Sequence, residues 1–168
     1  MSYKKKIILL ITLLTVSLLI GCSKTGYSGT KGGKTKYQDA ETDVVELTVY
    51  HYSDTPPVAD VFVKTDDGFY FKEEAFKENK DLIPVSEEIS DKINKWVDDY
   101  NIKSWDGFYM THEGVLDGGG FDLNITLVTG EKISAHGSNA YPDGYSEANK
   151  VLKEIIAEAL EEINAVQG

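Results

Sequence analysis

The chain has no arginine, a single cysteine and three histidines among its 168 residues. Its 17 lysines stand against 28 acidic residues, which gives a net charge of −11. Nucleic acids are bound through many cationic contacts, so this composition predicts no nucleic acid partner. One cysteine cannot form an internal disulfide, and in an exported protein it would be left unpaired.

Long apolar runs are also scarce. The most extended one, from Ile7 to Ile20, has 14 residues, whereas a helix needs about 20 to cross a bilayer. It follows Lys4-Lys5-Lys6 and ends at a small residue, Gly21. A basic head, a short apolar segment and a small residue before the cleavage point are typical of a secretory signal peptide, which we expect over residues 1–21.

The tetrapeptide Leu19-Ile20-Gly21-Cys22 resembles the lipobox of bacterial lipoproteins. In that family the cysteine thiol receives a diacylglyceryl group, the signal peptide is removed before it, and the protein stays on the outer face of the cell membrane. The resemblance implies lipidation at Cys22, a membrane partner held through that lipid, and an extracytoplasmic location. Two acyl chains anchor a protein stably, at about 0.8 kcal/mol per buried methylene. The alternative is a buried thiol at the end of an uncleaved helix.

Removal of Lys4, Lys5 and Lys6 with the signal peptide changes the net charge from −11 to −14. We expect residues 22–43 to be the lipidated N-terminus and a flexible tether, because this segment is rich in Gly, Ser, Thr and Lys and has no apolar periodicity. A Gly-rich chain of this length reaches about 25 Å. Its four lysines stand toward Cys22 and its three acids toward the following segment.

Residues 44–168 have the length of a single domain, and alternating patterns predict its strands. Apolar and polar residues alternate from Val45 to Tyr52, and a second strand is predicted from Val58 to Thr65. We expect Asp66-Asp67-Gly68 to form a three-residue hairpin loop with Gly68 left-handed, which pairs Val63 with Phe71. Residues 105–109 fit either a turn or another strand.

A further hairpin is predicted around Gly130, where the alternation from Phe121 to Leu127 resumes with Ile133 and Ala135. A two-residue loop would put Ile133 on the wrong face of the sheet. A three-residue loop with Gly130 left-handed pairs Ile125 with Ile133 and Phe121 with Gly137. We predict the second register.

Two amphipathic helices complete the predicted domain. One is capped by Ser86 and carries apolar residues at helical spacing from Ile89 to Tyr100. The last follows Pro142-Asp143-Gly144 and has an apolar stripe from Val151 to Ile163. The predicted fold class is therefore α+β, an antiparallel sheet of four to six strands with both helices packed on one face.

Three runs in the C-terminal half, together with the alternating strand from Phe121 and with Gly130, resemble a pattern in uncharacterised small lipoproteins and related proteins of Gram-positive bacteria. They are Trp105-Asp106-Gly107-Phe108, Val115-Leu116-Asp117-Gly118 and Gly137-Ser138-Asn139-Ala140-Tyr141-Pro142. The resemblance implies the same compartment and fold, and it brings no activity with it.

Catalytic motifs are missing: there is no G-x-S-x-G elbow, no H-E-x-x-H pair and no phosphate-binding Gly-Lys-Ser/Thr loop. His51, His112 and His136 never fall at a metal-ligand spacing. We therefore expect no enzyme, but a non-catalytic binding module for a cell-envelope ligand, such as a cell-wall component or a protein. The alternative is a small extracytoplasmic hydrolase with an unrecognised site.

The candidate binding site follows from the predicted register, which brings residues 117–120 and 138–143 to the same end of the sheet. There the oxygen atoms of Asp117, Asp122, Asn139 and Asp143 suit calcium, with Tyr141 as a ligand contact. Alternatives are a ligand-binding loop pair without metal, and a purely structural corner in which Asp143 caps the last helix. Among the aromatic residues, we expect Trp96 and Tyr100 in the core, and Tyr141 and Tyr145 exposed.

Overall fold

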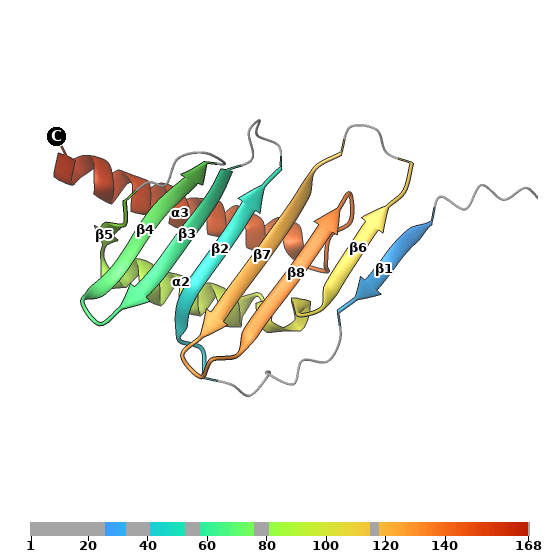
Figure 1. Ribbon diagram of the computed structural model, residues 1–168, viewed down its shortest axis with the longest axis horizontal. Coiled ribbons are helices and arrows are strands. Elements are labelled where there is room, and N and C mark those ends of the chain that lie inside the picture. Colours follow the sequence, from blue (N-terminus) through green and yellow to red (C-terminus); the bar gives the residue numbers. More distant parts are fainter. Residues whose placement is uncertain (1–25, 33–40, 53–57, 76–80, 115–117, 168) are drawn as a thin grey trace, which may run out of the picture.

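The computed structural model describes residues 26–32, 41–52, 58–75, 81–114 and 118–167, which form one sheet with two helices behind it (Figure 1). The strands are β1 (Tyr27–Lys31), β2 (Val44–His51), β3 (Val58–Thr65), β4 (Gly68–Ala75), β5 (Ile83–Val85), β6 (Phe108–His112), β7 (Gly120–Leu127) and β8 (Lys132–Ser138). Their order in the sheet is β1-β6-β8-β7-β2-β3-β4-β5. The α+β class is confirmed. The sheet has eight strands instead of four to six, and it is mixed because β6 and β8 are parallel.

The register predicted for the hairpin of β7 and β8 is confirmed. Ile125 lies opposite Ile133, and Phe121 lies opposite Gly137. Gly130 has a φ of 83°, which is the left-handed conformation that glycine adopts without steric cost. Along β7, buried residues alternate with more exposed ones, so the odd-numbered side chains from Phe121 to Leu127 face the helices.

The register predicted for β3 and β4 is wrong by one residue. Thr65 pairs with Gly68, so the loop is the two-residue Asp66-Asp67, and Phe71 lies opposite Phe62 instead of Val63. Such a slip exchanges the faces of all side chains in the strand. The observed register buries Phe62 and Phe71 together, with ring centroids 5.0 Å apart, and leaves Val63 on the helix-free face.

The two helices, α2 (Glu87–Asp99) and α3 (Tyr145–Gln167), pack against the same face of the sheet (Figure 1). The indole N–H of Trp96 donates a buried hydrogen bond of 2.8 Å to the carbonyl oxygen of Ala148, which joins α2 to the start of α3. Ser86 is the N-cap residue of α2, as predicted. Its hydroxyl donates to the carboxylate of Glu162 on α3 (2.7 Å) instead of capping its own helix. Among the described residues, no helix is long and apolar enough to cross a membrane.

The N-terminal part of the predicted tether belongs to the sheet. Residues Tyr27–Lys31 form β1, which pairs with β6 in antiparallel fashion at the edge. The signal-peptide segment, Cys22 and Asp117 lie outside the described residues, so the predictions made for them stay predictions. Residues 105–109, which fitted a turn or a strand, contain both: the 3₁₀ helix η1 (Ile102–Trp105) leads through a turn into β6.

Candidate functional site

The two helices lie behind the sheet from β5 across to β7, and among the described residues no α-helix lies over β1 and β6 (Figure 1). A cavity of about 520 Å³ lies at this end, on the helix side of the sheet. This volume is in the range of small-molecule sites, which is about 300–1,000 Å³. Strands β1 and β6, η1 and the loop before α3 supply its lining, which consists of Tyr27, Lys31, Ser104, Trp105, Phe108, Met110, Asn139, Ala140, Tyr141, Pro142 and Asp143.

The loop that closes one side of the cavity turns sharply at Asn139, which has a φ of 53°. Asparagine tolerates this left-handed conformation better than most residues do. The backbone N–H of Asn139 donates to the carbonyl oxygen of Gly119 at 2.9 Å. A Cβ atom on Gly118 would lie 1.3 Å from the Asn139 side-chain oxygen, and one on Gly119 would lie 3.1 Å from the Tyr141 hydroxyl oxygen. The glycines therefore make room for the side chains of the loop.

A stack of aromatic rings runs from the core to the cavity. The ring centroids of Tyr141 and Tyr145 are 4.6 Å apart, and those of Tyr145 and Phe121 are 4.7 Å apart. Trp105 contacts both Tyr145 and Phe121 from η1. Tyr141 is 45 % exposed, as expected, but Tyr145 is half-buried, contrary to the sequence expectation. Burial, with a smaller contribution from Tyr141, raises the pKa of Tyr145 to about 12.

The lining combines an apolar floor with a polar rim. Trp105, Phe108 and Met110 are buried and form the floor, whereas the Tyr27 side chain is 62 % exposed. Lys31 and Asp143 bring one charge of each sign to the lining, and Asn139 and Ser104 bring neutral hydrogen-bonding groups. Flat aromatic rings beside hydrogen-bonding groups can hold a ligand that has an apolar ring face and polar edges.

Of the five predicted site residues, three line this cavity: Asn139, Tyr141 and Asp143. Asp122 does not, because it follows the inward-facing Phe121 on β7 and lies on the other face of the sheet. The structure thus separates the Asp122 and Asp143 carboxylates proposed for calcium. Among the described residues, no three His, Cys, Asp or Glu side chains are close enough to share a metal ion. Asp117, the remaining carboxylate, lies outside them.

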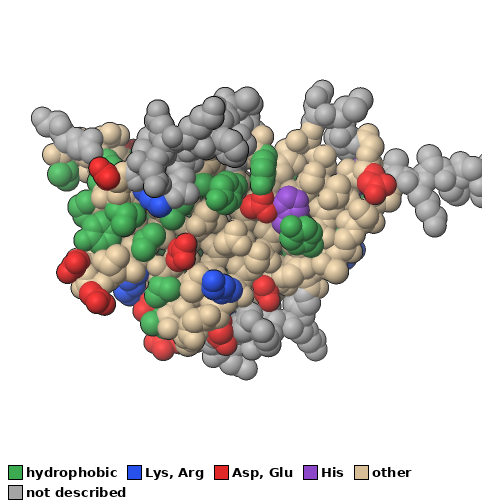
Figure 2. All heavy atoms as spheres, in the orientation of Figure 1, with side chains coloured by type: hydrophobic (Ala, Val, Ile, Leu, Met, Phe, Trp, Pro, Cys, Tyr) green, Lys and Arg blue, Asp and Glu red, His purple; other side chains and the backbone are tan. Residues whose placement is uncertain are grey.

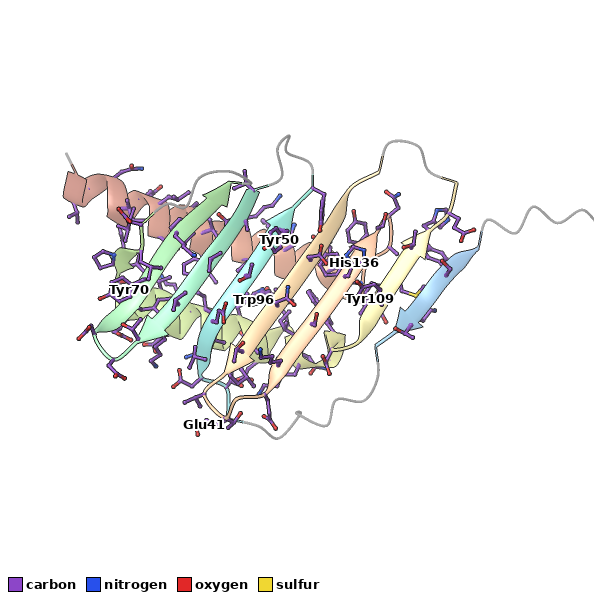
Figure 3. All side chains as sticks on the ribbon, viewed as in Figure 1. Glu41, Tyr50, Tyr70, Trp96, Tyr109 and His136 are labelled. Atoms are coloured by element: carbon purple, nitrogen blue, oxygen red, sulfur yellow. The ribbon has the colours of Figure 1, made fainter. Side chains whose placement is uncertain are left out.

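Asp122 belongs instead to a cluster on the helix-free face. Its Oδ1 lies 2.6 Å from Nδ1 of His136, and its Oδ2 accepts a hydrogen bond from the Tyr52 hydroxyl. The Tyr109 ring lies against the imidazole of His136, with centroids 4.9 Å apart. Figure 3 shows three side chains of this region, Tyr50 on β2, His136 on β8 and Tyr109 on β6. In the space-filling view of the same face, a histidine lies beside acidic and hydrophobic side chains (Figure 2). The hydrogen bond to Asp122 is the main cause that raises the pKa of Tyr52 to about 12.

The geometry of the cluster suits acid–base chemistry better than metal binding. A neutral imidazole that donates from Nδ1 to Asp122 has an acceptor at Nε2, which is the arrangement of a general base. Among the described residues, however, no serine, threonine or cysteine forms a hydrogen bond with His136. The contact between Asp122 and His136 could have been predicted from the sequence, because the predicted register that puts Phe121 opposite Gly137 also puts Asp122 opposite His136. The sequence did not indicate that Tyr27 and Lys31 line the cavity, because both lie in the segment predicted to be a tether.

No protein family, curated protein or solved structure matches the chain.

Proposed function

We propose that the protein is a lipoprotein anchored to the outer face of the cell membrane through Cys22, and that its folded part is a non-catalytic binding module for a cell-envelope ligand. The observation that carries the binding part is the cavity at the open end of the sheet. The signal-peptide pattern and the lipobox resemblance support the anchored, extracytoplasmic part.

The chemistry of the lining favours a saccharide of the cell wall as the ligand. The exposed rings of Tyr27 and Tyr141 offer flat apolar faces, on which a sugar ring can stack. Asn139, Ser104, Lys31 and Asp143 offer donors and acceptors for hydroxyl and amide groups. A charge of each sign in the lining also suits a saccharide that carries a short peptide.

Binding is tested by sedimentation of the soluble chain, from residue 23 onward, with purified cell walls. We expect the wild type to sediment with the walls, and Tyr141→Ala to lose most of this binding because the stacking face is removed. Tyr70→Ala, on β4 at the other end of the sheet, is the matched control and should bind as the wild type does. Equal sedimentation of the two variants would reject the cavity as the site.

Anchoring is tested separately by metabolic labelling with a palmitate analogue. The wild type should incorporate the label, and Cys22→Ala should remain unlabelled and uncleaved. Label that persists on the alanine variant would show that Cys22 is not the lipidated residue.

A second candidate function is a small extracytoplasmic hydrolase, and the 2.6 Å contact between Asp122 and His136 favours it. Such a pair orients an imidazole as a general base for the attack of water. The test is hydrolysis of a panel of chromogenic esters and glycosides by the wild type and by His136→Gln. Activity that depends on His136 supports the hydrolase, and activity that is absent or equal in both proteins removes it.

A further inference from the structure

Strand β1 begins very close to the proposed anchor. Only residues 23–26 separate Cys22 from Tyr27, the first residue of β1. An extended chain covers at most about 3.4 Å per residue, so the Cα atoms of Cys22 and Tyr27 lie no more than about 17 Å apart. We propose that the β1 edge of the sheet rests on the membrane surface to which Cys22 is anchored, and that it holds the cavity at the level of the lipid headgroups. The inference depends on the proposed lipidation of Cys22.

β1 is fixed to the sheet and is not a loose extension. Five consecutive residue pairs join it to β6, from Tyr27 opposite His112 to Lys31 opposite Phe108. The Thr30 hydroxyl donates to the carbonyl oxygen of Gly107 at 2.7 Å, and the rings of Tyr27 and His112 have centroids 4.6 Å apart. Gly29 has a φ of 136°, and a Cβ atom there would lie 1.7 Å from the Tyr109 carbonyl oxygen. Glycine is thus required for β1 to approach β6 this closely.

The distribution of charge along the sequence favours this edge, over the rest of the domain, as the part that faces an anionic surface. Residues 44–168 contain ten lysines and 25 acids, which gives a net charge of −15. Lys31 lies in β1, and Lys24, Lys34 and Lys36 are close to it in the sequence but lie outside the described residues. Anionic headgroups attract each of these lysines, whereas they repel the acidic body of the domain. Glu113, at the end of β6, is an acid at the same edge.

The exposed aromatic residues at this end fit the same orientation. Tyr27 on β1 and Tyr109 on β6 are 62 % and 61 % exposed, and tyrosine is enriched at the headgroup level of membrane proteins. Tyr27 and Lys31 also line the cavity, so the membrane-facing edge and the binding site share residues. A cavity held at headgroup level is suited to a ligand displayed at the membrane surface. A 21-residue free tether would instead let the site move about 25 Å from the anchor.

The width of the sheet allows two probes to be placed at known, different distances from the β1 edge. β4 lies six strands from β1, and neighbouring strands are about 4.8 Å apart, so the two strands are separated by about 29 Å. With the β1 edge on the membrane, a probe on β1 lies near the headgroups and a probe at the start of β4 lies far from them. A domain on a long free tether would hold both probes at similar average heights.

The experiment uses the full-length lipidated protein in vesicles of phosphatidylcholine and phosphatidylglycerol with a nitroxide on the headgroup of a tracer lipid. Acylation blocks the Cys22 thiol, so Ser28→Cys on β1 and Asp66→Cys in the β3–β4 turn each give one reactive thiol for a fluorophore. We expect quenching of the Ser28 probe to exceed that of the Asp66 probe by about threefold or more, because of the ~29 Å between the strands. Equal quenching of the two probes overturns the inference.

Three controls separate the possible failures. Intact mass measures the diacylglyceryl group on the same sample: an unmodified Cys22 overturns the proposed anchoring and this inference with it, whereas equal quenching of a lipidated protein overturns this inference alone. Insertion of about twelve Gly and Ser residues after Lys24 restores a long tether and should bring the quenching of the Ser28 probe down toward that of the Asp66 probe. Unchanged quenching after the insertion contradicts the proposal. Matching thermal melts of the labelled variants show that both remain folded.

Discussion

The two ends of the sheet are built differently. From β7 across to β5, α2 and α3 cover the sheet, and residues such as Leu47, Phe62 and Ile93 are fully buried. Over β1 and β6, the described segments that line the open space are η1 and the loop at residues 139–143, and a cavity of about 520 Å³ remains. The covered end buries the apolar surface that stabilises the fold, and the open end keeps aromatic and charged side chains accessible. Stability and binding are therefore expected to respond to different substitutions.

The largest difference between the ends should come from Phe62→Ala. The Phe62 side chain is fully buried against Phe69 and Phe71, and its loss leaves a cavity between β3 and the helices. We expect the free energy of unfolding to fall by about 3 kcal/mol or more. Tyr141→Ala, at a ring that is 45 % exposed, should cost much less. Urea unfolding of both variants checks this, and similar losses would show that the open end is as important for stability as the covered one.

A smaller effect is expected at the hairpin that joins the two ends through β7 and β8. Gly130→Val should lower the free energy of unfolding by about 1 kcal/mol or more, because a β-branched residue is strained at positive φ. No atom lies within 4 Å of a Cβ placed there, so the backbone strain acts alone. Thr129→Val, in the same turn, is the control. Coinciding urea melts of Gly130→Val and the wild type would disprove the left-handed turn.

The last effect is absent at neutral pH and appears only at alkaline pH. Tyr145, between the core and the cavity, has a pKa of about 12 in the folded protein, against 10.0 for the ordinary side chain. The folded state binds this proton more tightly, so its contribution to stability is complete below pH 10 and is lost as pH rises to about 12. Tyr145→Phe should reduce the fall of the melting temperature over this interval. If the wild type and the variant lose stability in parallel, Tyr145 is not held neutral by burial.

Much of the covered end was predictable from the sequence. The register of β7 and β8 followed from strict alternation and from a glycine at the one position that needs positive φ. The β3–β4 hairpin was one residue off because Asp66-Asp67-Gly68 accommodates a loop of two or three residues equally well. Only the burial of Phe62 against Phe71 distinguishes the two, and that depends on tertiary packing.

The open end was less predictable for a physical reason. β1 is exposed at all five positions and has no apolar alternation, so nothing in its own sequence distinguishes it from a tether. β1 forms because β6 would otherwise leave an unpaired edge of backbone N–H and C=O groups. Backbone hydrogen bonds hold it there, and these depend little on which side chains the strand carries. The half-burial of Tyr145 was missed likewise, because it depends on rings from η1, β7 and the loop.

The central claim, that the open end binds the envelope ligand, is tested most directly by nuclear magnetic resonance of the ¹⁵N-labelled soluble chain. Soluble saccharide fragments of the cell wall are titrated into the protein, and the backbone amide shifts are mapped. The account predicts saturable shifts at Lys31, Ser104 and Tyr141, with the helix-covered end unchanged. Shifts centred on Asp122 and His136, shifts over α2 and β3, or no shifts at all would contradict it.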